Sequence, residues 1–225
     1  MKPTLDFIQI IYKQEQWDKC YPWAQKYFNP TLTDYFENQV IADIVPTLNA
    51  DYISVCSWRL AQKRNDFPFE LPHKTLTEEK ILSHEFDIAV LTPRSPRHQP
   101  LLMASEWHGK AWDNAFSVFK TEFLPTIGIT CPDELTRAVY ENHFIAKKEI
   151  YHSYVKDALI PAIRFMDERD IFKADSGYIH KKRDAEEIKN YQEKSGRVDW
   201  PIGVFILERL FSIYIEGKPY KIINL

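Results

Sequence analysis

Short apolar runs recur along the chain and predict the strands of a sheet. The first run, Phe7–Tyr12, is nearly continuous, which is typical of a strand covered on both faces. Further runs predict strands over 51–58, 86–92, 142–146 and 220–223. Helix-like segments separate them, so the order of elements predicts an α/β fold with a mainly parallel or mixed sheet flanked by helices.

The helices are predicted from apolar residues at helical spacing. Thr33 is a candidate N-cap for a helix that Pro46 ends. The last helix, 203–216, is apolar around most of its circumference, which predicts that it is buried. The other helix-like stretches are 17–28, interrupted by Pro22; 107–125; and 150–166, with a bend expected at Pro161.

Length and composition favour one domain. The chain has 225 residues, of which 44% are hydrophobic, so a single domain over 1–225 can bury a stable core. The stretch 60–82 is polar and contains Pro68 and Pro72, which predicts a surface excursion or a lid. The stretch 167–200 is predicted to be a polar insertion of helix and loop, with an exposed helix over 184–194.

Charge and cysteine usage narrow the expected partners and location. The 29 basic and 32 acidic residues are spread along the chain, so no basic field for nucleic acid is expected. The three cysteines are far apart, which favours free thiols in the cytoplasm. The sequence contains no apolar run long enough to predict a membrane-spanning helix.

Motif searches exclude several enzyme classes. The sequence contains no P-loop, no Gly-rich dinucleotide turn, no H-E-x-x-H and no G-x-S-x-G, which argues against kinases, dehydrogenases and ordinary esterases. It also lacks the D-x-D pair with which many sugar transferases hold a divalent cation. The sequence therefore identifies no cofactor. A manganese or magnesium ion stays a candidate cofactor, although the sequence contains no D-x-D motif to hold it.

Glu208 and Arg209 are the leading candidates for chemistry. Ionised groups on an otherwise apolar helix need partners or a ligand, because burying a charge is costly. In the functional interpretation Glu208 is a general base that deprotonates an acceptor hydroxyl and Arg209 steers a phosphate or sugar. In the alternative both residues are structural and pair with charges in the core.

Further candidates lie in or beside predicted strands and helices; Asp87, Asn142 and His143 fall inside predicted strands. His143 is a second catalytic candidate and Asn142 a substrate-binding one, because an imidazole and an amide can bind sugar hydroxyls or position a leaving phosphate. In the alternative both residues satisfy loop backbone groups. Each of the others has an equally simple structural alternative, as a solvated charge, a core aromatic or a plain loop residue. These remaining substrate-binding candidates are Asp87, Arg94, His98, Trp107 and Asp175.

Aromatic residues make up 14% of the chain, enough either to line a sugar or nucleotide pocket or simply to fill the core.

Three stretches of the chain resemble a bacterial family of glycosyltransferase-like proteins from capsule and exopolysaccharide gene clusters. A helix leads into a strand that ends at Arg59, which matches the last arginine of the family's His-Tyr-Arg-Arg motif. The other two stretches are Asn142–Tyr151, with its Lys-Lys pair, and Gly203–Leu210, with its Glu-Arg-Leu.

The resemblance implies a nucleotide-sugar-dependent transferase with a compact GT-A-like, Rossmann-related fold. It implies a nucleotide-sugar donor and a glycan or lipid-linked acceptor, with Arg59 among the phosphate or sugar contacts. A peripheral association with polysaccharide machinery remains open. Two other hypotheses are kept: a non-catalytic nucleotide- or carbohydrate-binding protein of the same fold, and an interaction protein that uses its aromatic surface.

Overall fold

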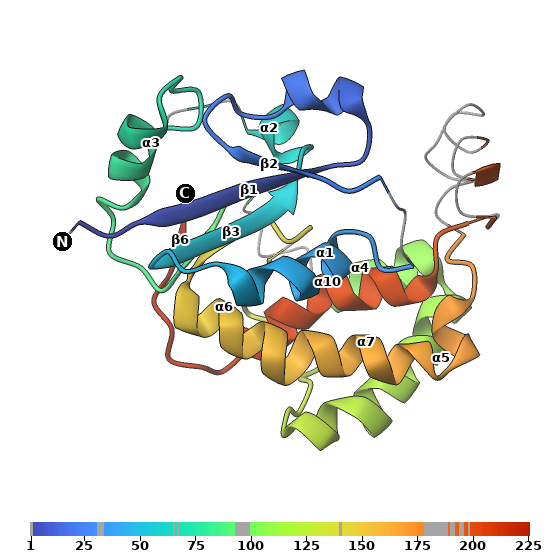
Figure 1. The fold of residues 1–225 in the computed structure, drawn as a ribbon. Helices are drawn as coiled ribbons and strands as arrows, with labels where there is room; N and C mark the ends of the chain where they lie inside the picture. The colour runs from blue at the N-terminus through green and yellow to red at the C-terminus, as the bar shows by residue number, and fades with distance from the viewer. Residues whose placement is uncertain are drawn as a thin grey trace.

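The computed structural model describes residues 2–30, 34–64, 66, 68–92, 100–139, 141–177, 189, 192–193, 196–197 and 199–225. Its described strands form one six-stranded sheet in the order β2-β1-β3-β5-β4-β6 (Figure 1). The strands are β1 (Leu5–Ile11), β2 (Gln25–Phe28), β3 (Tyr52–Ser57), β4 (Ile88–Val90), β5 (Phe144–Lys147) and β6 (Ile222–Asn224). Only β5 runs antiparallel to its neighbours, β3 and β4, so the sheet is mixed.

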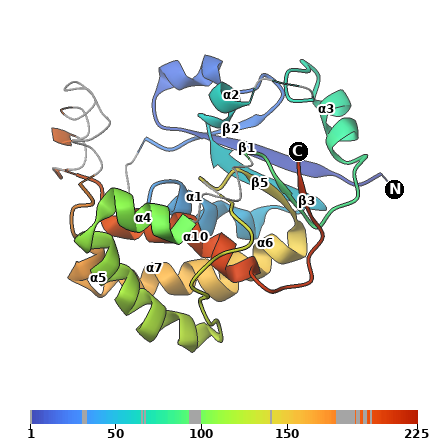
Figure 2. The ribbon, with the colours of Figure 1, turned by 180° about the vertical axis from the view of Figure 1, so that it is seen from behind.

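Helices cover both faces of this sheet, which confirms the predicted α/β class. Figures 1 and 2 show α1, α6, α7 and α10 on one side of the strands and α2 and α3 on the other. The helices are α1 (Glu37–Ile44), α2 (Leu60–Lys63), α3 (Lys74–Ile81), α4 (Pro100–His108), α5 (Lys110–Val118), α6 (Lys148–Tyr154), α7 (Ile160–Asp167) and α10 (Ile202–Ile215).

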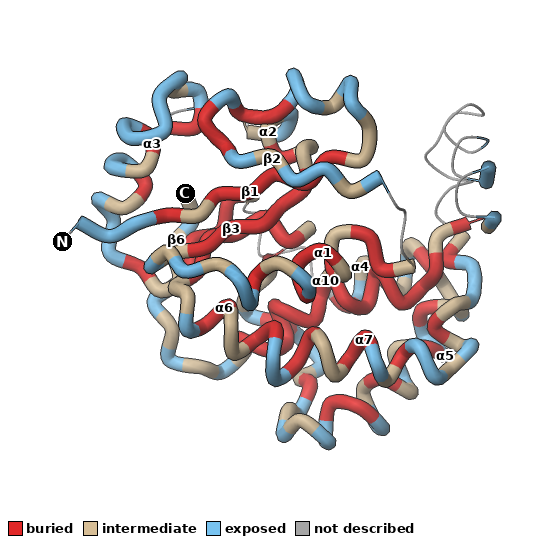
Figure 3. Tube along the Cα trace, viewed as in Figure 1, coloured by how far each residue is buried: buried red, intermediate tan, exposed pale blue. Residues whose placement is uncertain are grey.

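Alternating side chains of the strands feed two separate cores, one on each face. In β5, Phe144 and Ala146 join the large core under α1, α6 and α10, whereas Ile145 joins the smaller core under α2 and α3. The same alternation holds in β4, because successive side chains of a strand point to opposite faces. In Figure 3 the inner strands are therefore buried, whereas the edge strand β2 is largely exposed.

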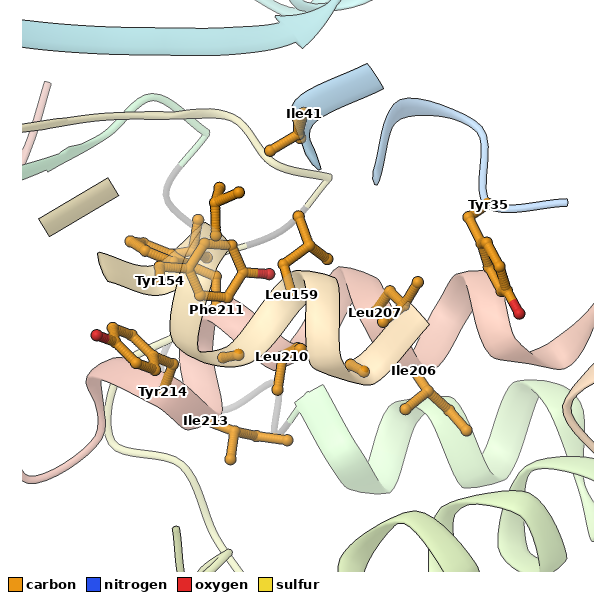
Figure 4. Packing of buried hydrophobic residues seen from close by; sticks show 14 of the residues in the cluster. Tyr35, Ile41, Tyr154, Leu159, Ile206, Leu207, Leu210, Phe211, Ile213 and Tyr214 are labelled. Atoms are coloured by element: carbon orange, nitrogen blue, oxygen red, sulfur yellow. The ribbon is translucent and has the colours of Figure 1, made fainter. Parts of the chain in front are cut away.

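The last helix, α10, is the centre of the larger core, as the sequence predicts. Every residue of α10 except Glu208 is buried. Figure 4 shows Phe211 and Tyr214 of α10 beside Leu159 and Tyr154 of the long helix. This long helix comprises α6, a π-helical turn (Val155–Leu159) and α7, and the turn lies just before Pro161, near the expected bend.

Three expected helices differ from the observed structure. The helix-like stretch 17–28 forms a 3-10 helix, Gln14–Lys19, and then the edge strand β2, which pairs with β1. The stretch that begins at Trp107 is two helices, because Gly109 adopts a left-handed φ of 58° between α4 and α5. Helix α1 begins only at Glu37, and Thr33 lies outside the described residues.

Both predicted polar stretches contain core residues, with Phe172 of the stretch 167–200 buried in the larger core. The stretch 60–82 contains α2 and α3, and Leu60, Phe69 and Ile81 are buried in the smaller core. Most of the helix expected over 184–194 lies outside the described residues. Among the described helices, none combines the length and the apolar character that crossing a bilayer requires.

Candidate functional site

Loop residues from four strands meet at one edge of the sheet. Tyr12 follows β1, Arg59 lies two residues after β3, and Thr92 lies two residues after β4. Because β5 is antiparallel to β3 and β4, the residues that precede it, 141–143, lie at this same edge. Open α/β sheets bind ligands outside the carboxyl ends of their parallel strands, so this edge is the first place to look for a site.

Helix α1 begins at this edge and contributes a carboxyl group. Its first residue, Glu37, is half-buried and lies close to Tyr12 and Arg59. Burial raises the pKa of Glu37, and the Arg59 guanidinium opposes that effect. Burial, reinforced by the Glu37 charge, also raises the pKa of the Tyr12 phenol well above its ordinary value. The pKa values of Glu37 and Tyr12 are therefore raised mainly by burial, and the Arg59 charge opposes the rise.

Backbone strain concentrates at the same edge. Among the described residues, the non-glycine residues with positive φ are Phe36 (48°), Glu141 (58°) and Asn142 (56°). Phe36 immediately precedes α1, and the other two form the turn before β5. Such conformations cost about 1–3 kcal/mol each and tend to occur at functional sites.

The turn before β5 is held by contacts to α1 and α2 and by one contact within the turn itself. Asn142 is buried and its Nδ2 donates to Oδ1 of Asn38 in α1 at 3.2 Å. The Glu141 carboxylate forms an ion pair with the Lys63 ammonium of α2 and lies 3.5 Å from Nδ1 of His143. These contacts fix the Glu141 carboxylate at the sheet edge.

Glu208 and Arg209 complete the edge from α10. Arg209 is only 5% exposed, and its Nη1 donates to the Glu208 carboxylate at 2.8 Å and to the carbonyl oxygen of Phe205 at 3.0 Å. The Glu208 side chain keeps 23% exposure. The structural alternative thus holds for the Arg209 contacts, whereas Glu208 is paired and still reaches the surface.

The pKa of Glu208 is raised to about 7. Burial is the largest cause, the Arg209 charge opposes it, and the negative charges of Glu141 and Glu37 raise the pKa further. At neutral pH this carboxyl group therefore exists in both protonation states, which is the property that a general acid or base needs.

Together these side chains form what we call the edge cluster. It combines three carboxyl groups with two guanidiniums, an ammonium, an imidazole and a phenol. Its members are Tyr12, Glu37, Arg59, Lys63, Glu141, His143, Glu208 and Arg209. Such a set can move a proton and bind an anion. Within the described ranges, no group of three or more His, Cys, Asp or Glu side chains is arranged to hold a metal ion.

The edge cluster brings together some predicted site residues. Arg59, His143, Glu208 and Arg209 belong to it, and Asn142 anchors its strained turn. His143 is fully buried, so its contacts are with the protein, including Glu141 and the hydroxyl of Thr92 at 3.5 Å. The catalytic role expected for His143 stays a prediction.

Other predicted residues lie elsewhere. Asp87 sits at the opposite edge, before β4, where its carboxylate binds the Lys147 ammonium at 2.7 Å and accepts from the Lys221 amide at 2.8 Å. The Lys147 hydrogen bond lowers the pKa of Asp87, which marks a structural ion pair. Trp107 lies in the last turn of α4, and Asp175 is exposed beside Pro201. Arg94 and His98 lie outside the described residues.

Sequence reasoning did not single out Tyr12, Glu37 or Lys63. A signal did exist for Tyr12, because it lies at the end of the first predicted strand. Open α/β sheets commonly bind ligands beyond the ends of their strands. Glu37 and Lys63 join the cluster only through tertiary packing of α1 and α2. Their roles required coordinates.

Comparisons with protein-family models, with curated proteins and with solved structures find no match to this chain. The functional argument therefore depends on the edge cluster itself.

Proposed function

We propose that the edge cluster is the active site of a glycosyltransferase that moves a hexosyl group from a nucleotide-sugar to a glycan or lipid-linked acceptor. The observation that carries the proposal is the Glu208 carboxyl group, which is partly exposed, has a pKa of about 7 and lies beside Arg209 at the ligand-binding edge of an α/β sheet. The resemblance of the Glu-Arg-Leu stretch supports the same reaction class.

In the proposed reaction Glu208 takes the proton from an acceptor hydroxyl. The acceptor oxygen then bonds to the anomeric carbon of the donor sugar, and the bond from that carbon to the diphosphate breaks. The nucleoside diphosphate leaves with the electron pair. Glu208 must be deprotonated to act as the base, so the rate is expected to rise as the pH increases through about 7.

Arginine side chains are suited to the leaving diphosphate. Arg59 is half-buried at the end of β3, and its guanidinium lies 5.8 Å from the centre of the Trp58 ring. Guanidiniums bind phosphate oxygens through paired hydrogen bonds, which lets Arg59 stabilise the charge that develops as the diphosphate leaves. The proposal includes a cytoplasmic location, which the buried free thiols Cys20, Cys56 and Cys131 favour.

A donor survey tests the proposal. UDP-, GDP-, ADP- and dTDP-sugars are incubated with the protein, with and without manganese or magnesium, and nucleotide release is measured with and without simple sugar acceptors. We expect one donor class to release its nucleotide in the presence of an acceptor. Arg59→Met should weaken donor binding about 10- to 100-fold, the effect of losing a charged hydrogen bond.

Arg164→Met is the matched control, because Arg164 is exposed on α7 and takes no part in the edge cluster. Binding without turnover under all conditions would favour the non-catalytic binding protein. If no donor binds and no donor releases its nucleotide, the assignment to nucleotide-sugars is overturned.

A further inference from the structure

The turn before β5 holds a glutamate in a backbone conformation that this residue seldom adopts. Glu141 has a φ of 58° and Asn142 a φ of 56°. Glycine tolerates this region freely and asparagine tolerates it better than most residues, but a glutamate there is strained by about 1 kcal/mol or more. The chain has a carboxylate at this position although glycine or asparagine would relieve the strain.

Several independent contacts fix the position of the Glu141 carboxylate. Besides the Lys63 and His143 contacts, the backbone amide of Leu91 donates to the carbonyl oxygen of His143 at 2.9 Å, which ties the turn to the end of β4. The buried hydrogen bond from Asn142 to Asn38 ties it to α1. A strained turn persists when its neighbours fix it in this way.

The turn is also fixed relative to α10. Phe144 begins β5, three residues after Glu141, and its ring stacks on that of Phe211 with centroids 3.9 Å apart and planes 6° apart. Phe211 lies about one helical turn after Glu208. The stack therefore holds the segment that carries Glu141 against the segment that carries Glu208.

Charged groups from several elements face these two carboxyl groups. Arg209 from α10, Glu37 from α1 and Glu141 from the turn act on Glu208. Glu37 in turn lies beside Arg59 and Tyr12. Lys63 of α2 and His143 contact Glu141. Lys63 thus neutralises part of the charge that Glu141 presents to Glu208.

We propose that Glu141 is a positioning residue of the site: the strained turn, the Lys63 ion pair and the Phe144–Phe211 stack hold its carboxylate where its negative charge acts on the Glu208 carboxyl group. The catalytic importance of this effect depends on the proposed function. The electrostatic link itself does not, so it can be measured without any substrate.

The proposal predicts opposite effects for two substitutions. Glu141→Gln removes a negative charge, which makes the ionised form of Glu208 less costly and lowers its pKa. Lys63→Met leaves the Glu141 charge uncompensated and raises the pKa of Glu208. One exchanged charge at a partly solvated edge is expected to shift this pKa by about half a pH unit. A purely structural contact would not produce shifts of opposite sign.

The test is a carbon-13 NMR titration of glutamate side-chain carboxyl groups in the full chain, with the Glu208 signal assigned from Glu208→Gln. Glu141→Gln should move the Glu208 midpoint down and Lys63→Met should move it up. Glu141→Asn is the second charge-removing variant, because asparagine accepts the left-handed conformation and protects the fold. Glu149→Gln, exposed on α6, is the control and should leave the midpoint unchanged.

An unchanged midpoint in both charge variants, or a shift in the same direction in both, would overturn the proposal. If the proposed function holds as well, the acid limb of the kcat/KM profile should follow the NMR midpoint in each variant. If the midpoints move as expected but no transferase activity is found, the electrostatic link between Glu141 and Glu208 stands and only the proposed function is overturned.

Discussion

Glu208→Gln is expected to reduce kcat/KM for hexosyl transfer by about 100- to 10,000-fold, the usual contribution of a positioned general base. The substitution removes the group that accepts the acceptor proton but keeps nearly the same shape. An amide oxygen can still accept from Nη1 of Arg209, which now donates to Glu208 at 2.8 Å, so the fold should persist. Steady-state rates measured with the donor identified in the survey provide the measurement.

Two comparisons make the Glu208 result specific. Far-UV circular dichroism of Glu208→Gln should match that of the unmodified protein, because the helix around residue 208 is otherwise packed in the core. Glu149→Gln should transfer at the normal rate, since Glu149 is exposed on α6. Normal turnover by Glu208→Gln would remove Glu208 from the mechanism.

Phe211→Ala is expected to lower the free energy of unfolding by about 3–5 kcal/mol, the range measured for removing a large buried aromatic side chain. Phe211 is 1% exposed, and its ring packs on Phe144, Tyr151 and Tyr154. Small domains are stable by only about 5–15 kcal/mol, so this loss is a large fraction of the total. Urea denaturation followed by tryptophan fluorescence measures it.

Leu102→Ala is the control for that experiment, because Leu102 is 60% exposed on α4 and its truncation leaves no buried cavity. The control should stay within about 0.5 kcal/mol of the unmodified protein. Equal stability losses in the two variants would show that the packing around Phe211 is not what holds α10 against β5.

Much of the fold follows from periodicity in the sequence. The run at residues 7–12 predicts β1, and the apolar circumference of 203–216 predicts the buried helix α10. Both signals are strong because a strand or helix surrounded by protein must be apolar on nearly every side. The α/β class follows from the alternation of strands and helices, but the reversed direction of β5, which makes the sheet mixed, does not.

The misassigned elements are those whose structure depends on distant partners. Strand β2 has only four residues, mostly exposed, and it is a strand because it pairs with β1. Its sequence carries no alternation to separate it from a helix. The break at Gly109 is the exception, because its signal is local: Gly109 has a φ of 58° and a ψ of −141°, a combination that residues with a side chain seldom adopt and that interrupts the helix.

The candidate site could be predicted only in part, because some of its residues come together only through tertiary packing. Glu208 and Arg209 stand out because charges are rare on a buried helix, and the structure places them at the sheet edge. Asp87 stood out as a charge inside a predicted apolar strand, but it lies just before the amino end of β4 and pairs with Lys147. Glu37 looks like an ordinary first-turn acid, and only the packing of α1 brings it to Arg59.

The account depends most directly on the ionisation of Glu208 in the unmodified protein. A carbon-13 titration of its side-chain carboxyl group, with no substrate present, should give a midpoint near pH 7, because burial and the neighbouring acids outweigh the Arg209 charge. A midpoint below about pH 5, the range of an ordinary glutamate, would contradict the central claim that this residue is poised to exchange a proton at neutral pH.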